Sequence, residues 1–275
     1  MNNVKTAVLL AALSGLLIAV GGALGGAGGA MTFFVVALAM NVGSYWFSAD
    51  IVLRTAGAHE IQREQDPPLF GLIESVATAA EMPMPRVYVI ESPQPNAFAT
   101  GRDPKHAAVA VTTGIRALLT ERELRGVLGH EMAHVKNRDI LTSSVVATIA
   151  SAISMLGWMA MWFGGRNREG GGAATLVAVL VAPIAATLIQ LGISRTREYQ
   201  ADRDGARIVG DPEALASALA KLEMGAQRVQ MQVPESTAHL FIVNPLRAEG
   251  LSGLFSTHPP IAERVARLHR MAGIE

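Results

Sequence analysis

The feature that most constrains this chain is a run of residues near its N-terminus, 6–49, that contains no charged side chain. About 20 apolar residues are enough for a helix to cross a lipid bilayer. The run is long enough for two such helices, and the glycine-rich residues 21–30 lie between them. Small residues let two membrane helices pack closely. We therefore expect residues 1–53 to form a transmembrane hairpin.

A cleaved signal peptide is the alternative interpretation of this segment. Lys5 supplies a positive charge before the apolar run, and small residues follow it. The apolar run, however, continues far beyond the 7–15 residues of a signal-peptide core. A retained membrane hairpin is the better explanation.

A second uncharged region begins at residue 140. Residues 140–165 and 173–194 are two candidate spans, separated by a polar, glycine-rich turn that contains Arg166 and Arg168. Pro183 lies inside the second of these spans, and membrane helices tolerate proline. The chain thus divides into a hairpin at 1–53, a polar segment at 54–139, a second hairpin at 140–194 and a polar segment at 195–275. The alternative is that residues 140–194 form buried helices of a globular core.

The distribution of basic residues predicts the orientation in the membrane. With four spans, seven basic residues near the span ends share one side: Lys5, Arg54, Arg63, Lys136, Arg138, Arg195 and Arg197. The other side has only Arg166 and Arg168. Basic residues gather on the cytoplasmic side of membrane proteins. The two polar segments are therefore expected to face the cytoplasm.

Composition excludes several classes of function. The formal net charge is zero, which gives no basic surface for nucleic acid. There is no cysteine, so disulfides, thiol catalysis and thiolate metal sites are excluded. Only 17% of the residues are charged, against about 25% in a typical soluble domain. The two long uncharged regions lower this average.

In the polar segments, proline, glycine and helix-capping residues separate short predicted helices and strands, as in a small α+β domain. Residues 66–85 read as a helix that prolines begin and end. Three short segments rich in Val and Ala, at 86–92, 96–100 and 106–114, read as strands of a small sheet. Thr120 and Glu123 form a capping box that opens the next helix. Asp211 and Pro212 begin another helix, and a last helix is expected over 260–271, before Gly273.

The chemically most informative motif is H-E-x-x-H, formed by His130, Glu131 and His134. On a helix the two histidines are four residues apart and face the same ion. Glu131 lies about 100° around the helix from His130, where it can reach a metal-bound water as general base. The alternative is a chance match in which both histidines are ordinary core or surface residues.

Two histidines leave a catalytic zinc site one protein ligand short. Glu198 and Asp202 lie four residues apart after the second hairpin, so Glu198 can be the third ligand and Asp202 can accept a ring N–H from a ligand histidine. The alternative is a solvated charged face in which both carboxylates pair with Arg195, Arg197 or Arg203. An even number of membrane crossings returns Glu198 to the side of His134, which favours the metal site.

Four motifs in this order resemble the HtpX heat-shock proteases, membrane zinc metallopeptidases of the M48 group. They are "PNAFATG", "LGHEMAHVKNRD", "SRTREYQADRDGA" and "STHPP". The resemblance covers essentially the whole chain, including both hairpins. It implies one Zn²⁺ per chain held by His130, His134 and Glu198, with Glu131 catalytic. It also implies a bacterial inner-membrane location, a cytoplasm-facing active site and endoproteolysis of misfolded or damaged membrane proteins.

The other two motifs give further candidates. By resemblance, Asn96, Ala97 and Phe98 line the substrate cleft, where an extended peptide pairs with a strand edge. A simple turn asparagine after Pro95 is the alternative for Asn96. His258, before a proline-started helix, is a candidate donor to the oxyanion. A structural or capping histidine is the alternative there.

The expectation is therefore an α+β membrane protein with four transmembrane helices and a mainly helical, zincin-like domain carrying a small β-sheet, divided between residues 54–139 and 195–275. Expected partners are the lipid bilayer, misfolded or damaged protein substrates and other membrane quality-control proteases. The alternative is a membrane chaperone or scaffold with a structural zinc site. A structural site would need a fourth protein ligand, and the sequence offers no obvious one.

Overall fold

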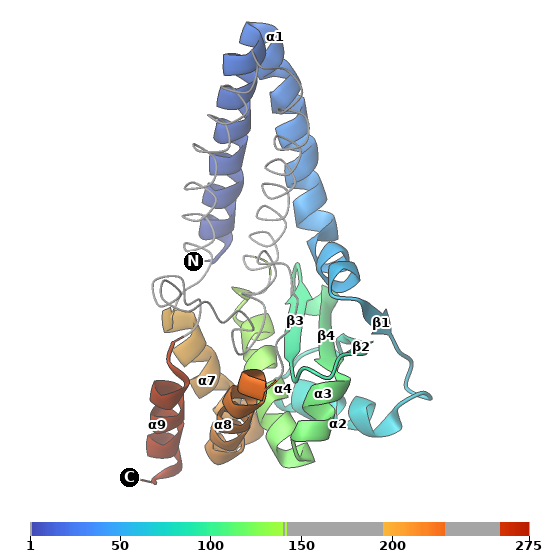
Figure 1. The fold of residues 1–275 in the computed structure, drawn as a ribbon, viewed down its shortest axis with the longest axis vertical. Helices are drawn as coiled ribbons and strands as arrows, with labels where there is room; N and C mark the ends of the chain where they lie inside the picture. Colours follow the sequence, from blue (N-terminus) through green and yellow to red (C-terminus); the bar gives the residue numbers. More distant parts are fainter. Residues whose placement is uncertain (1, 140, 142–194, 229–258, 275) are drawn as a thin grey trace.

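The computed structural model describes residues 2–139, 141, 195–228 and 259–274. Its helices are α1 (Asn2–Thr55), α2 (Pro67–Ala79), α3 (Thr113–Leu118), α4 (Glu121–Lys136), α7 (Arg195–Val209), α8 (Pro212–Arg228) and α9 (Ile261–Ala272). Its strands are β1 (Ala58–Glu60), β2 (Arg86–Ile90), β3 (Ala97–Gly101) and β4 (Ala107–Thr112), and a short 3₁₀ helix spans Pro104–His106. The described part is thus mostly helical with a small sheet, and a long hairpin rises from it (Figure 1).

The hairpin is α1, whose helix is broken at Gly25 and Gly26. Gly26 has φ 56°, a left-handed conformation that glycine adopts without strain. The two arms approach closely at Gly21, where an added Cβ would lie 2.5 Å from the Gly29 carbonyl oxygen. Asn41 also donates a hydrogen bond of 2.8 Å to Ser14 of the other arm. Residues 2–55 therefore form a helical hairpin whose arms pack through glycine, as predicted.

One arm of α1 has the properties of a membrane span. Residues Gly25–Phe47 form a helix long and apolar enough to cross a bilayer, and the other arm holds a shorter apolar stretch, Leu10–Ala19. Large apolar side chains such as Met31, Phe34 and Leu38 are exposed on the second arm. The third and fourth predicted spans, residues 140–165 and 173–194, fall almost entirely outside the described residues.

The sheet is mixed and has the order β1-β2-β4-β3. The β2 and β4 strands are parallel, whereas β1 pairs antiparallel with β2 and β3 pairs antiparallel with β4. The three predicted strands are all present; β1 is an additional three-residue strand. The position of β3 at one edge leaves its outer side free of strand partners within the described part of the chain.

Both faces of the sheet are covered, which is why its strands read as continuous apolar segments. Val87, Val109 and Val111 face the main core together with α2, α4 and α8 residues. Phe98 and Tyr88 face the other way and pack against Leu53 at the end of α1. Because alternate strand residues point to opposite faces, the sheet attaches the hairpin to the helical part.

Helices α2, α4 and α8 begin where the sequence predicts, whereas the short helix α3 was not predicted. Asp66 caps α2 by accepting a hydrogen bond from the Leu69 amide, and Thr120 and Glu123 form the complete capping box of α4. Asp211 accepts from the Ala214 amide at the start of α8. The last helix, α9, ends at Gly273 in the left-handed conformation.

Helices α4 and α7 are in contact through glycine. A Cβ added to Gly205 of α7 would lie 2.6 Å from the His130 amide nitrogen of α4. A Cβ added to Gly129 would lie 2.9 Å from the Gly205 carbonyl oxygen. At these distances the two backbones can approach only because neither residue has a side chain.

We expect Gly205→Ala to destabilise the protein by about 1–3 kcal/mol, because the new methyl group would collide with backbone atoms of α4. Thermal unfolding in detergent measures this change. Gly71→Ala is the matched control, since Gly71 is an exposed helical residue with nothing within 4 Å of an added Cβ. A Gly205→Ala protein as stable as the control would show that the contact can relax without cost.

The carboxylate of Glu123 is buried at the beginning of α4. It accepts hydrogen bonds from Thr120, from Ser217 at 2.6 Å and from Lys221 at 2.8 Å. Burial opposes ionisation, but these donors lower the pKa of Glu123 from 4.5 to about 2. The ionised Glu123 therefore stabilises the folded protein fully above its unfolded-state pKa. This contribution to the free energy of unfolding is lost as the pH falls from about 4 towards 2.

We expect Glu123→Gln to cost about 1–2 kcal/mol at neutral pH. The difference in unfolding temperature between wild type and Glu123→Gln should narrow when the pH is lowered from 5 to 3. The exposed Glu121, in the same helical turn, provides the control variant Glu121→Gln. A difference that stays constant over this pH range would contradict the assigned role of the charge.

Candidate metal centre

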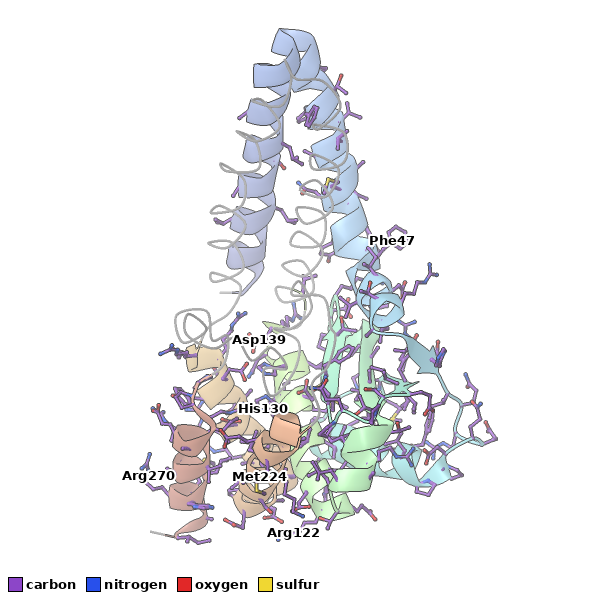
Figure 2. All side chains as sticks on the ribbon, in the orientation of Figure 1. Phe47, Arg122, His130, Asp139, Met224 and Arg270 are labelled. Carbon is purple, nitrogen blue, oxygen red and sulfur yellow. The ribbon has the colours of Figure 1, made fainter. Side chains whose placement is uncertain are left out.

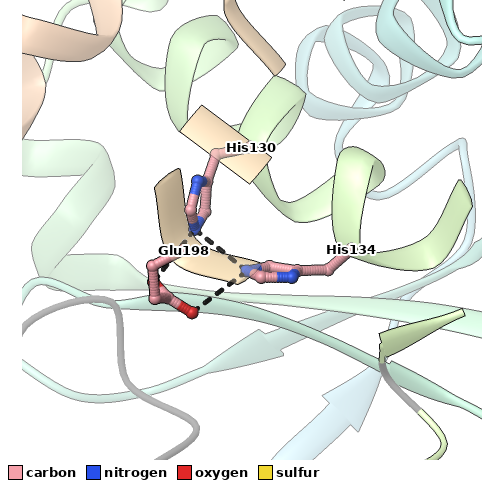
Figure 3. A group of neighbouring side chains, drawn as sticks. All are labelled: His130, His134 and Glu198. Carbon is pink, nitrogen blue, oxygen red and sulfur yellow. Dashed lines mark hydrogen bonds and ion pairs between the residues drawn. The ribbon is translucent and has the colours of Figure 1, made fainter. Parts of the chain in front are cut away.

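His130 and His134 lie on α4, one helical turn apart, on the side that faces α7. Both rings are largely buried, and their Nε2 atoms are 3.2 Å apart. The rings meet edge to face at 87°. The i, i+4 spacing therefore brings two imidazole nitrogens to one point, as the sequence predicts (Figure 3).

Glu198, in the first turn of α7, brings a carboxylate to the same point. Its Oε1 lies 3.5 Å from His134 Nε2, and its Oε2 lies 3.8 Å from His130 Nε2. These three residues form the one cluster in the described part of the chain whose ligand atoms could hold a metal ion. Residues from two helices thus converge, although His134 and Glu198 are 64 positions apart in the sequence (Figure 3).

The other nitrogen of each ring faces a carboxylate. His134 Nδ1 is 3.2 Å from Asp139 Oδ2, and His130 Nδ1 is 3.0 Å from Asp202 Oδ1. This arrangement favours a proton on each Nδ1 and leaves each Nε2 lone pair directed into the cluster. It is the arrangement by which ligand histidines are usually oriented.

The donor atoms fit a single small cation. Atoms bound to zinc at about 2.0–2.2 Å in a tetrahedron lie about 3.3–3.6 Å from each other. The distances here, 3.2, 3.5 and 3.8 Å, are close to that value. Lone pairs facing one another at such distances repel unless a positive charge lies between them.

The surrounding charge also favours a cation. Four carboxylates lie in or beside the cluster: Glu131, Asp139, Glu198 and Asp202. Among the described residues they are opposed by the guanidinium groups of Arg197 and Arg264. Burial alone would lower the pKa of His134, but hydrogen bonds to Asp139 and Glu198 raise it to about 10. Burial lowers the pKa of His130. Without a cation, His134 would therefore hold a proton on Nε2 as well; a bound metal ion would displace this proton and take over the positive charge.

Glu131 lies next to the cluster but is held by the sheet. Its Oε2 accepts a hydrogen bond of 2.8 Å from the Ala99 amide on β3. Burial raises the pKa of Glu131 to about 7, although His134 and the Ala99 amide act in the opposite direction. A carboxylate with a pKa near neutrality is suited to accept and return a proton. The sequence predicted that Glu131 lies beside the metal ligands, but it did not predict the hydrogen bond to β3.

Arg264 of α9 is a residue that sequence analysis missed. Its side chain is completely buried and forms a two-point ion pair with Asp202, with distances of 2.6 and 2.8 Å. A third nitrogen lies 3.7 Å from Glu198 Oε2. Arg264 thus connects the C-terminal helix to both carboxylates of α7. The available signal was its place on the apolar stripe of α9, between Ile261 and Leu268, where a charge is unexpected.

Asp139 was also missed as a partner of His134, and no spacing rule in the sequence indicated it. The alternative interpretation of Glu198 and Asp202 as a solvated charged face is wrong, because both are buried. The guanidinium that pairs with Asp202 comes from α9 rather than from a neighbouring residue of α7.

The structure places the remaining predicted residues as follows. Asn96 is buried directly before β3, and its backbone amide donates to Thr112 Oγ1 at 2.8 Å. The side chain of Ala97 faces the main core, and that of Phe98 faces the end of α1. Any contact of Ala97 with a peptide would therefore use its backbone, whereas both the side chain and the backbone groups of Phe98 face other parts of the protein. His258 lies outside the described residues.

We expect Arg264→Met to lower the affinity for a divalent metal about 10- to 100-fold, because Asp202 and Glu198 lose the group that orients them. Competition between the protein and a coloured chelator for Co²⁺ or Zn²⁺ measures this affinity. Arg264→Lys should recover part of it, since it restores the charge without the two-point geometry.

Arg267→Met, one turn away, removes an exposed guanidinium paired with Glu263 and is the matched control. Metal affinity equal to wild type in Arg264→Met would show that the ligands are oriented without Arg264.

Comparisons with known proteins agree with this geometry. Residues 64–272 match the model of peptidase family M48. The chain is 53% identical over 276 residues to a protein called Protease HtpX homolog from Methylibium petroleiphilum, covering 98% of each chain. It is also 53% identical over 277 residues to the Protease HtpX homolog of Burkholderia thailandensis, covering 98% of this chain and 97% of the relative.

A solved structure shares the fold. The crystal structure of S. mikatae Ste24p superposes with a TM-score of 0.52 and 21% sequence identity, over 86% of this chain. This chain spans 57% of the length of that protein. The family match and the two relatives cover most or all of the sequence. The chain therefore belongs to peptidase family M48 and is a metallopeptidase of the HtpX type.

Proposed function

We propose that this chain is a membrane-embedded zinc endopeptidase that cleaves misfolded or damaged membrane proteins. The observation that carries the proposal is the convergence of His130, His134 and Glu198 on one point, with Glu131 beside them. Membership of a metallopeptidase family supports the hydrolytic reaction. We propose three further points: that the metal is zinc, that the cleaved bonds are internal to the substrate chain, and that the substrates are misfolded or damaged membrane proteins.

In this proposal His130, His134 and Glu198 hold one Zn²⁺. Two imidazoles and a carboxylate are a common ligand set of catalytic zinc, which keeps one position open. Bound zinc would supply Lewis acidity, which polarises a carbonyl oxygen and acidifies water. Asp202 and Asp139 hold the Nδ1 protons of the two histidines and so keep both Nε2 atoms available.

Glu131 is the proposed general base. It takes the proton from the attacking water and passes it to the nitrogen of the departing amine. Its hydrogen bond to Ala99 holds the carboxylate beside the ligands. His258 remains the proposed donor to the developing oxyanion.

The outer edge of β3, which has no strand partner in the described part of the chain, is the proposed site of the peptide substrate. The Thr112 amide donates to the Asn96 carbonyl, so the even-numbered residues 96, 98 and 100 are the ones whose backbone groups face β4. The backbone groups of Ala97 and Ala99 consequently point to the outer edge, where Ala99 already contacts Glu131. An extended peptide added along this edge would bring its carbonyl groups next to the general base.

The membrane placement rests on α1. Its arm Gly25–Phe47 can span a bilayer and carries exposed apolar side chains. Phe47 lies where the hairpin meets the soluble part, and Arg122 and Arg270 lie at the far end from it (Figure 2). With the basic-residue distribution, we infer a multi-pass protein of the bacterial inner membrane whose active site faces the cytoplasm. Unfolded segments of membrane proteins at this surface would be its substrates, and other membrane quality-control proteases its partners.

The test is cleavage of casein by the protein purified in detergent with a chelator and then supplied with zinc. Wild type should cleave casein only after zinc is added, and should bind one equivalent of zinc. Glu131→Gln should bind zinc as wild type does but lose at least about 100-fold in kcat, because the proton acceptor is gone.

Glu198→Ala is the companion variant and should lose both zinc and cleavage. Glu121→Gln, which removes an exposed carboxylate from the same helix, is the control for charge. If wild type binds one equivalent of zinc tightly but neither it nor Glu131→Gln cleaves casein, the proposal fails and a chaperone or scaffold with structural zinc replaces it.

A further inference from the structure

A cavity of about 680 Å³ lies at the base of the α1 hairpin, where it meets the segment that connects β3 and β4. None of its lining residues belongs to the metal cluster. One side of it is formed by Ala7 and Leu10 of the first arm of α1, Tyr45 of the second arm, and Leu141. The other side is formed by the segment that connects β3 and β4, including Arg102 and Lys105, and by Arg138 after α4. The cavity thus joins an apolar wall to a basic one.

The basic wall has an excess of positive charge. Arg102, Lys105 and Arg138 line it, and Asp103 is its one acidic residue. Asp103 accepts hydrogen bonds from its own turn, pairs with His106 at 2.8 Å and lies 3.7 Å from the Arg102 guanidinium, so the lining keeps an excess of two positive charges. Within the described part of the chain, Lys105 and Arg138 form no ion pair. Two exposed cations without carboxylate partners are suited to a phosphate group.

The apolar wall lies at the end of the proposed membrane span. The span ends at Phe47, and the cavity is lined by Tyr45, two residues earlier. The Arg102 guanidinium lies 4.6 Å from the ring centroid of Trp46. Tyrosine and tryptophan gather at the level of lipid head groups. The basic wall is therefore at the height of the lipid phosphates, and the apolar wall continues towards the acyl chains.

We propose that this cavity binds an anionic glycerophospholipid, with its phosphate between Arg102, Lys105 and Arg138 and an acyl chain along Leu10 and Leu141. An anionic lipid, rather than a zwitterionic one, matches the excess charge, since each basic residue near a membrane surface favours an anionic lipid about fivefold. The site rests on the proposed membrane placement of α1. A bound lipid would hold the segment between β3 and β4 against the bilayer. It would thereby also hold β3, the strand that contacts Glu131.

Trp46 provides a local reporter. The chain has three tryptophans, and Trp158→Phe with Trp162→Phe leaves Trp46 alone. The full-length protein carrying these two changes would be reconstituted in phosphatidylcholine bilayers. Trp46 fluorescence would then be measured as brominated phosphatidylglycerol or brominated phosphatidylcholine replaces part of the lipid. Bromine quenches tryptophan at short range, so the two curves give the relative affinity of the site for the two lipids.

We expect brominated phosphatidylglycerol to be preferred at least about fivefold, the value for one basic residue. Arg102→Gln with Lys105→Gln should reduce the preference to less than about twofold, because Asp103 then offsets Arg138, the one basic residue that remains in the lining. Arg125→Gln with Arg207→Gln removes the same charge from exposed positions outside the cavity and should leave the preference unchanged. If loss of the Arg102–Trp46 contact prevents folding, the single variant Lys105→Glu, at an exposed residue, should still lower the preference.

The other outcomes overturn the proposal in distinguishable ways. Equal quenching by the two lipids places Trp46 in the bilayer but excludes an anionic lipid site. A preference that survives in both Lys105 variants assigns the lipid to another surface. Absence of quenching by either lipid removes the membrane placement of α1, and the lipid site with it.

Discussion

The contact between α4 and α7 is the interaction on which the site depends. Gly129 and Gly205 allow the two backbones to meet, and a single methyl group at Gly205 would lie 2.6 Å from the His130 amide. At this separation a glutamate on α7 reaches both histidines of α4. With α7 moved outward by the thickness of a side chain, the Glu198 carboxylate would be too far away to share one ion with His130 and His134. The geometry of the ligand set is therefore a consequence of helix packing.

Two further sets of contacts, to α8 and to α9, fix the same region. Glu123 attaches the beginning of α4 to α8 through Ser217 and Lys221. Arg264 attaches α9 to Asp202 and Glu198. These are buried charges with several partners each, so removing one partner leaves a costly unpaired charge. Such a network favours one arrangement of the helices over alternatives with similar apolar packing.

The sheet has two roles in this arrangement. Its β3 edge supplies the amide that holds Glu131, and the segment after β3 supplies the basic wall of the cavity beside the hairpin. Its far face packs against the end of α1 through Phe98 and Leu53. Under the proposed function, the substrate strand, the general base and the membrane surface are thus connected by a single short strand. This explains how α1, which ends at Thr55, and the metal ligands, which begin at His130, are connected in the fold although they are far apart in the sequence.

The sequence by itself determined the elements whose signals are local. The charge-free run and its glycines predicted the hairpin, the i, i+4 spacing predicted the paired imidazoles, and Thr120 with Glu123 predicted the start of α4. The third ligand was also predicted, because two expected membrane spans before Glu198 would return the chain to the side of His134. Only the tertiary structure decided that Arg264 pairs with Asp202, that Asp139 faces His134 and that β3 holds Glu131. Those contacts join residues of different elements, and their geometry follows from how closely the helices and the sheet edge pack, which no local pattern records.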